Sequence, residues 1–179
     1  MVIITTYNRP SNLRDLLDDI EREKYTGDVL VVNDGSTVEY DLTGYSFDIN
    51  YLTWENNKGK TKYYQVISSA YKYTKKFKFN YLWQLPDDVR LNDGFFKDSV
   101  QIWNSINDSN KICLSTGHTH NRHLKSCWTD FSPIRYNEKV IKTQWNDLCF
   151  ISTKMFLEKL SYDVDVNSER WNTRKDLGS

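Results

Sequence analysis

Short apolar runs alternate with stretches of helical spacing through the first half of the chain, and this alternation constrains the fold more than any other feature. Runs rich in apolar and β-branched residues predict four strands, at residues 1–5, 28–32, 49–54 and 81–85. Strands that alternate with helices pair in parallel through crossovers, and ligands bind beyond the carboxyl ends of such strands. We therefore expect an α/β fold with a mixed, mostly parallel sheet flanked by helices.

Two amphipathic stretches fill the intervals between these strands. In the first, leucine and isoleucine recur at helical spacing from Leu13 to Ile20, and Ser11 is the expected N-cap just after Pro10. The second, residues 60–76, directs five residues inward: Tyr63, Val66, Ile67, Ala70 and Tyr71. The less regular second half predicts helices at 94–106 and 154–160, strands at 112–116 and 148–152, and an extended segment at 126–134.

Composition limits the classes of partner. The 179 residues suit a single domain, 1–179. Lys plus Arg and Asp plus Glu both total 24, and this zero net charge gives no support for a nucleic-acid partner. Three cysteines without C-x-x-C spacing fit a reducing, cytoplasmic compartment. No apolar run approaches the roughly 20 residues of a membrane span, so no integral membrane segment is expected. The polar tail after Tyr162 is where a longer native chain would have been cut.

Polar residues follow the first two predicted strands. Thr5, Tyr7 and Arg9 offer a hydroxyl, an aromatic ring and a guanidinium that can stack on a base and bond its edge, although an ordinary polar turn closed by Pro10 is the alternative. Asp34, in an Asp-Gly turn, leaves a carboxylate that can accept a hydrogen bond from a nucleobase or ribose. A hairpin turn is the alternative, but no alternating strand follows it. We favour the site.

Charged residues follow the third and fourth predicted strands. Lys58, Lys60 and Lys62 open a helix against its dipole, a conflict that a bound diphosphate would relieve, whereas a solvated basic face is the alternative. Asp87 and Asp88 come directly after an apolar strand, and paired carboxylates there are costly unless a positive group lies beside them. Hard oxygen ligands of this kind suit Mg²⁺ or Mn²⁺, and an Asp pair that caps a turn is the alternative.

These segments together resemble the family 2 glycosyltransferases of the GT-A fold. The matching segments, in family order, are residues 3–10 (IITTYNRP), 31–37 (VVNDGST) and 85–88 (LPDD). The helix start at 60–63 is also similar to the basic segment that the family has near the phosphates. The sequence departs from the family pattern at Asn33 and Pro86, where many members have aspartate. The resemblance covers about the first half of the chain and implies a single GT-A (Rossmann-like) domain, with nucleotide-sugar binding in the N-terminal half and the acceptor side in the C-terminal half.

The resemblance also implies roles for individual residues. Asp88 would bind Mn²⁺ or Mg²⁺, and seven residues would bind the nucleotide-sugar: Thr5, Tyr7, Arg9, Asp34, Lys60, Lys62 and Asp87. The implied reaction moves a sugar from a nucleoside-diphosphate sugar, with a UDP-sugar favoured, to a hydroxyl on a glycan with inversion. Such a reaction needs a general base within reach of the acceptor hydroxyl. Asp147 is the expected base, with Asp130 and Asp163 as competitors.

Histidines and tryptophans suggest two further features. The three histidines fall within residues 117–123 near Cys127, where they could bind zinc, although a loop that lines the acceptor site fits better because no recognised zinc spacing is present. Three tryptophans could stack on sugar faces or simply fill cores: Trp83, Trp128 and Trp145.

Rival functions differ in what they require. A sugar nucleotidyltransferase or a dinucleotide-binding dehydrogenase would carry a glycine-rich phosphate loop, and no G-x-G occurs in the sequence. A glycan- or nucleotide-binding module that keeps the fold without turnover stays open because of Asn33 and Pro86.

Overall fold

A computed structural model describes residues 1–109, 111–116, 134–135, 141–142 and 149–162. Its elements follow one another as β1 (Val2–Thr6), α1 (Pro10–Arg22), β2 (Val29–Asn33), β3 (Ile49–Thr53), α2 (Gly59–Thr74), β4 (Tyr81–Pro86), α3 (Phe95–Ser105), β5 (Leu114–Ser115), β6 (Ile134–Arg135), β7 (Ile141–Lys142), β8 (Phe150–Thr153) and α5 (Lys154–Lys159). Strands and helices alternate through the first half, as the sequence predicts, except that β3 follows β2 without a helix between them.

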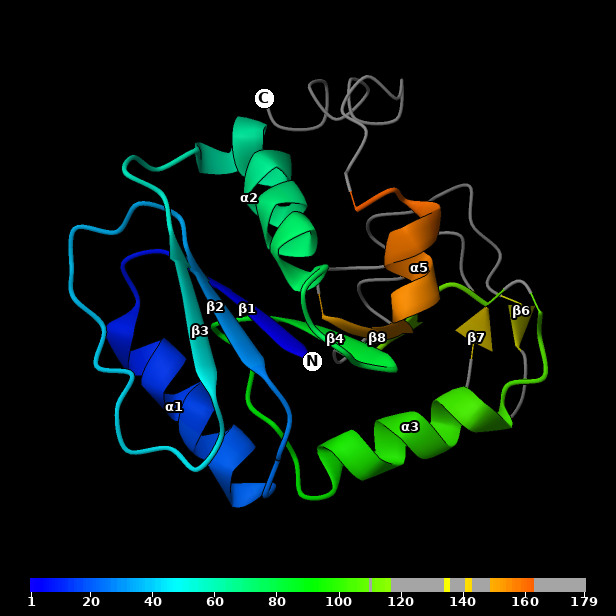
Figure 1. The fold of residues 1–179 in the computed structure, drawn as a ribbon. Coiled ribbons are helices and arrows are strands. Elements are labelled where there is room, and N and C mark those ends of the chain that lie inside the picture. Colours follow the sequence, from blue (N-terminus) through cyan, green and yellow to red (C-terminus); the bar gives the residue numbers. More distant parts are fainter. Residues whose placement is uncertain (110, 117–133, 136–140, 143–148, 163–179) are drawn as a thin grey trace.

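A six-stranded sheet in the order β3-β2-β1-β4-β8-β5 forms the centre of the molecule (Figure 1). Strands β1 to β4 pair in parallel, and β8 is antiparallel to both β4 and β5. Strands β6 and β7 pair separately. This mixed, mostly parallel sheet with helices on both faces is the predicted GT-A, Rossmann-like fold.

Two hydrophobic clusters cover the two faces of the sheet. On one face, alternate residues of β1 and β2 pack against α1 and α3, and on the other face the intervening residues pack against α2 and α5. Strand β1 is buried along its whole length because both neighbours are strands and both faces carry helices. Its carboxyl end is therefore held firmly, which matters because the predicted site begins there.

Local details differ from the sequence prediction at two places. Helix α1 begins at Pro10 with Arg9 as its N-cap, so the prediction that Ser11 is the N-cap was wrong. Proline fits the first helical position because its missing N–H would be unpaired there anyway, and this places Ser11 inside the first turn. The strand predicted at 112–116 is shorter, with only Leu114 and Ser115 paired to β8.

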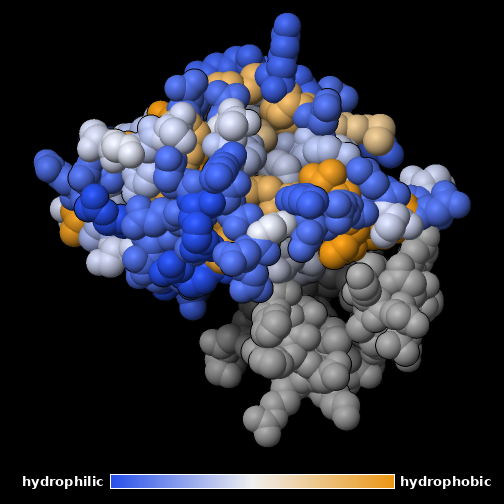
Figure 2. All heavy atoms as spheres, turned by 90° about the horizontal axis from the view of Figure 1, so that it is seen from below, coloured by the Kyte–Doolittle hydropathy of each residue, from blue (hydrophilic) through white to orange (hydrophobic). Residues whose placement is uncertain are grey.

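Hydrophilic side chains cover most of the described surface in Figure 2, and hydrophobic residues appear there as separate patches. Within the described part of the chain, no helix is both long and apolar enough to cross a membrane.

Candidate active site

The loops after β1, β2 and β4 meet at one edge of the sheet. Strand β1 lies between β2 and β4. The chain adds β2 and β3 on one side of β1 and then returns to add β4 on its other side, so the strand order reverses at β1. Backbone hydrogen bonds continue past the strands, from Asp34 N to Thr6 O at 3.0 Å and from Asp87 N to Thr5 O at 3.3 Å. In open α/β sheets such a switch point is where the crevice for a ligand forms.

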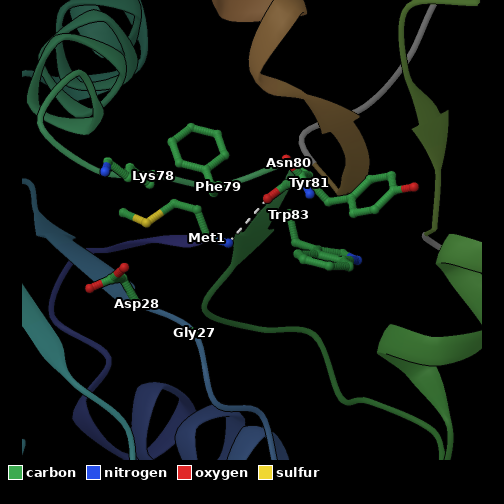
Figure 3. A pocket seen from close by; sticks show the side chains of 8 residues that line it. All are labelled: Met1, Gly27, Asp28, Lys78, Phe79, Asn80, Tyr81 and Trp83. Carbon is green, nitrogen blue, oxygen red and sulfur yellow. Dashed lines mark hydrogen bonds between the residues drawn. The ribbon is translucent and has the colours of Figure 1, made fainter.

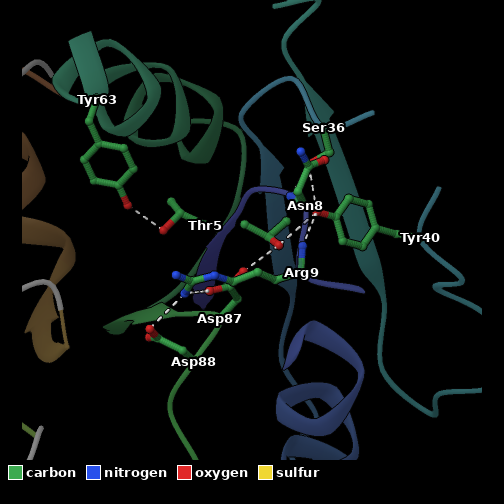
Figure 4. A network of polar contacts seen from close by, with 9 residues as sticks. Thr5, Asn8, Arg9, Ser36, Tyr40, Tyr63, Asp87 and Asp88 are labelled. Carbon is green, nitrogen blue, oxygen red and sulfur yellow. Dashed lines mark hydrogen bonds and ion pairs between the residues drawn. The ribbon is translucent and has the colours of Figure 1, made fainter. Parts of the chain in front are cut away.

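The acidic pair lies at this switch point beside a guanidinium (Figure 4). Arg9 Nη1 lies 2.9 Å from Asp88 Oδ2 and 3.3 Å from Asp87 Oδ1. Thr6 donates its hydroxyl proton to Asp87 Oδ2 at 2.8 Å. The Asp87 side chain is 6% exposed, whereas those of Asp88 and Arg9 are each 51% exposed. The positive group expected beside the two carboxylates is thus present in the protein itself.

The electrostatics of this corner follow from burial. Burial raises the pKa of Asp87, and the Thr6 hydrogen bond and the Arg9 charge offset only part of that effect. The hydrogen bond to Asp88 and the charge of Asp87 raise the pKa of Arg9 above its usual value. Arg9 therefore stays a cation, and its single positive charge lies between two carboxylates and reduces their mutual repulsion.

The acidic pair also fits a divalent cation by its donor chemistry. Asp87 and Asp88 supply hard carboxylate oxygens, and Asp88 is half exposed, so it can be reached from solvent. No group of three or more His, Cys, Asp or Glu ligands occurs among the described residues, so water and substrate phosphates would have to complete the shell. Asp88 is the better ligand, since both oxygens of Asp87 already accept protein hydrogen bonds.

Asp34 lies at the neighbouring corner and is held by the loop before α2. Lys58 N donates to its Oδ1 at 2.8 Å, and Asn57 Nδ2 donates to its Oδ2 at 2.9 Å. Gly35 adopts a φ of +71°, and a Cβ there would lie 2.4 Å from the Asn56 backbone, so glycine is needed for this close approach. Burial raises the pKa of Asp34, and the backbone donors offset part of the effect.

Asn33, the first departure from the family pattern, has a structural function. Its Nδ2 donates to Tyr51 Oη at 2.7 Å and to Thr53 Oγ1 at 3.2 Å on β3, and its Oδ1 accepts from Ser36 N at 2.9 Å. The amide supplies donors and an acceptor at once, which a carboxylate cannot. Asn33 therefore fastens β2 to β3 and shapes the turn that carries Asp34.

The other predicted donor residues surround these two corners. Thr5 Oγ1 lies 2.5 Å from the Tyr63 hydroxyl of α2, and burial raises the pKa of Tyr63 to about 12, which keeps the phenol neutral. Tyr7 is 43% exposed at the end of β1. Lys60 and Lys62 are exposed in the first turn of α2, as their sequence position predicts.

Trp83 belongs to the core. It is 6% exposed, its ring makes edge contacts with Tyr25 and Phe96, and its Nε1 donates to Ser99 Oγ at 2.9 Å. The hypothesis that Trp83 stacks on a sugar was therefore wrong, because the side chain points into the α1 face of the sheet. Other predicted residues lie outside the described ranges: Asp147, Asp130, Asp163, the segment 117–123 with its histidines, Cys127, Trp128 and Trp145.

Three hydroxyl groups that the sequence did not single out join the site. Tyr40 Oη lies 3.1 Å from Thr6 Oγ1 and 2.8 Å from Ser36 Oγ, and Ser36 Oγ accepts from Asn8 N at 2.9 Å. Thr6 and Ser36 lie within the matching segments 3–10 and 31–37. Tyr40 lies in a segment without periodicity, so no sequence signal could have found it.

A separate pocket of about 280 Å³ opens at the opposite edge of the sheet (Figure 3). Its lining includes Met1, Asp28 and Lys78, which lie near the amino ends of β1, β2 and β4. Trp83 contributes to the lining, but none of the residues predicted to bind the donor or the metal does. The polar cluster at the carboxyl ends is therefore the candidate active site.

Comparison with known proteins identifies the family of this chain. The model of the family described as Glycosyl transferase family 2 matches residues 1–159, which is most of the chain. The protein belongs to glycosyl transferase family 2. A search of curated proteins found no match.

Two solved structures of S. aureus TarS show the same fold. The crystal structure of S. aureus TarS 1-349 matches with a TM-score of 0.57 and 18% identity, over 89% of this chain and 48% of that one. A second S. aureus TarS structure matches with a TM-score of 0.55 and 17% identity, over 88% and 29%. The mannosyltransferase PcManGT from Pyrobaculum calidifontis, in complex with GDP-Man and Mn2+, gives 0.49 and 18%, over 64% and 34%. This chain thus spans less than half of each of these proteins.

Proposed function

We propose that this protein is a metal-dependent glycosyltransferase that moves one sugar from a nucleoside-diphosphate sugar to a hydroxyl of a glycan, with inversion. A UDP-sugar is the favoured donor. Family membership supports the class of reaction. The observation that carries the donor site is the cluster of Thr6, Arg9, Asp87 and Asp88 at the switch point of the sheet.

The nucleoside end of the donor would lie between Tyr7 and Asp34. The exposed ring of Tyr7 offers a stacking surface. The Asp34 carboxylate accepts one hydrogen bond from a side chain and one from the backbone. It has further lone-pair positions for a base N–H or a ribose hydroxyl. Thr5 faces α2, where its hydroxyl bonds to that of Tyr63.

The diphosphate end would lie between the acidic pair and the start of α2. Lys60, Lys62 and Arg9 supply positive charge for the phosphates. Asp88, with Asp87 beside it, would hold Mn²⁺ or Mg²⁺, which would stabilise the charge of the departing diphosphate. Arg9 would then be free to turn from Asp88 to a phosphate oxygen. Asp147 is our proposed general base for the acceptor hydroxyl.

A donor-hydrolysis assay tests this proposal. The protein is incubated with UDP-, GDP- and dTDP-sugars, with and without Mn²⁺, and release of free nucleoside diphosphate is measured beside calorimetric binding. Mn²⁺-dependent release by the wild type, lost in Asp88→Asn, supports the transferase. Tight binding of a nucleotide-sugar without release would favour the inactive binding module, and the absence of any binding would contradict both.

A further inference from the structure

Tyr40 connects three segments of the candidate site through a single oxygen. Its hydroxyl lies 2.8 Å from Ser36 Oγ, 3.1 Å from Thr6 Oγ1 and 3.4 Å from Arg9 N (Figure 4). The ring packs on the core that α1 shares with the sheet. Tyr40 therefore joins the loop after β2 to the loop after β1 while its ring is anchored beneath them.

Thr6 is the donor at the centre of these contacts. Its hydroxyl donates to Asp87 Oδ2 at 2.8 Å and also points towards Tyr40 Oη at 3.1 Å, so one proton serves two acceptors. Tyr40 Oη in addition accepts from Arg9 N and shares a hydrogen bond with Ser36 Oγ, which accepts from Asn8 N.

The result is one relay of connected hydrogen bonds, which runs from Asn8 N–H to Ser36, from Ser36 to Tyr40, and from Tyr40 to Thr6 and Asp87. Because neighbouring bonds in it share hydroxyl groups, they polarise one another and strengthen the set. One end lies beside Asp34 in the turn after β2, and the other end is the acidic pair. The relay spans the distance between the proposed nucleoside and diphosphate ends.

We propose that Tyr40 is a positioning residue for donor binding, acting through Thr6 to orient the Asp87 carboxylate and to hold the turn at Ser36 in register with it. This inference rests on the proposed function. Tyr40 is not a catalytic residue, because its oxygen already serves Thr6, Ser36 and Arg9 N. Its removal changes where other groups lie.

If Tyr40 only supported the fold, removing its hydroxyl should affect binding no more than removing another hydroxyl from the same segment. The chain offers such a matched control. Tyr45 lies in the same segment between β2 and β3, is also half-buried, and packs on the same core. Its hydroxyl donates to Asp18 Oδ1 at 3.1 Å, away from Thr6 and the acidic pair. Tyr45→Phe and Tyr40→Phe each remove one phenol oxygen and keep the ring.

The experiment measures binding of UDP in the presence of Mn²⁺ by calorimetry for the wild type and the variants. We expect Tyr40→Phe to weaken UDP affinity about fivefold, as the loss of one hydrogen bond in a network implies, and Tyr45→Phe to leave it unchanged. Thr6→Val should weaken it similarly, Thr6→Ser should restore it, and Tyr40→Phe should add little in the Thr6→Val background.

A second readout needs no nucleotide. Amide hydrogen exchange at Arg9 and, to a smaller extent, at Asn8 should quicken in Tyr40→Phe and stay unchanged in Tyr45→Phe. Only the former removes the acceptor of Arg9 N and the hydroxyl that holds Ser36, the acceptor of Asn8 N.

The outcomes separate the two proposals. A wild type that binds no nucleotide would overturn the proposed function itself. A wild type that binds UDP, with equal affinities for Tyr40→Phe and Tyr45→Phe or with additive effects of Tyr40→Phe and Thr6→Val, would overturn the inference about Tyr40 alone.

Discussion

Helix α1 contacts two acidic clusters that differ in how fully the protein itself satisfies them. Near its carboxyl end, Asp19 is buried and accepts from Arg90 Nε at 2.7 Å, Arg90 Nη2 at 2.9 Å and Leu91 N at 2.9 Å, with Arg22 as a further donor. At its amino end, Asp87 and Asp88 share one guanidinium, that of Arg9. Asp19 leaves no room for a ligand, whereas half-exposed Asp88 does.

The pKa values express the same difference. Burial opposes ionisation of Asp19, yet the hydrogen bonds from Arg90, Leu91 and Arg22 outweigh it and lower the pKa to about 2. Burial raises the pKa of Asp87, and Thr6 and Arg9 offset it only in part. A carboxylate whose hydrogen bonds outweigh the cost of its burial has a structural function. A carboxylate whose burial is only partly offset can still bind a cation from solution.

The two clusters are linked by the chain between them. Residues 87–94 run along α1, where Arg90 also pairs with Asp15 at 3.0 Å and Gly94 N donates to Glu23 Oε1 at 3.2 Å. The cluster at Asp19, which the protein satisfies fully and which we call the closed cluster, thus fixes this segment. The segment begins at the acidic pair of Asp87 and Asp88, which we call the open cluster. Substitutions at the two clusters should accordingly separate effects on activity from effects on stability.

The largest effect is expected at the open cluster. Asp88→Ala should lower transferase activity about 1000-fold, because losing several kcal/mol of charge stabilisation by a metal costs tenfold for each 1.4 kcal/mol. Steady-state rates with Mn²⁺ measure the change. Asp93→Ala is the matched control in the same segment, since its side chain is 95% exposed, and its activity should stay near that of the wild type. Equal losses in both variants would remove Asp88 from the site.

The closed cluster should instead govern the free energy of unfolding. Asp19→Ala leaves two arginines facing a buried gap, and removing one partner of a buried pair costs about 3 kcal/mol. Asp15→Ala breaks only an exposed pair with Arg90 and should cost at most about 1 kcal/mol. Urea denaturation measures both. If Asp15→Ala were as destabilising as Asp19→Ala, burial would not distinguish the two pairs.

A smaller effect concerns acid stability. The folded-state pKa of Asp19, about 2, lies below the unperturbed 3.8, so its contribution to stability is complete above the unfolded value. That contribution is lost as the pH falls from about 4 towards 2. The melting temperature of the wild type should drop through this window more steeply than that of Asp19→Asn. Parallel curves would show that Asp19 ionises alike in both states.

The smallest effect tests whether Arg9 competes with the metal. Arg9→Ala should tighten Mn²⁺ binding without nucleotide about threefold, since an exposed pair such as Arg9–Asp88 is worth at most about 1 kcal/mol. Arg9→Lys keeps the charge and should bind Mn²⁺ like the wild type. Electron paramagnetic resonance of free Mn²⁺ measures both. Weaker binding by Arg9→Ala would mean that Arg9 orders the acidic pair and does not compete for it.

The sequence predicted the parts of this account that depend on neighbours along the chain. Strand runs, the helical spacing from Leu13 to Ile20 and the polar residues at strand ends are local, and the structure has them where they were expected. Arg9 and Asp87 are 78 positions apart, and no local pattern predicts that they pair. The sequence left the position of Trp83 open between core and site and gave no signal for Tyr40, because packing across the sheet decides where an aromatic ring points.

The most direct test is a crystal structure with UDP and Mn²⁺, with manganese located by its anomalous signal. Our account predicts a single strong peak that bridges the Asp88 carboxylate and the diphosphate, with Arg9 turned away from Asp88. Manganese absent from that corner, or UDP bound while Arg9 still pairs with Asp88, would contradict it.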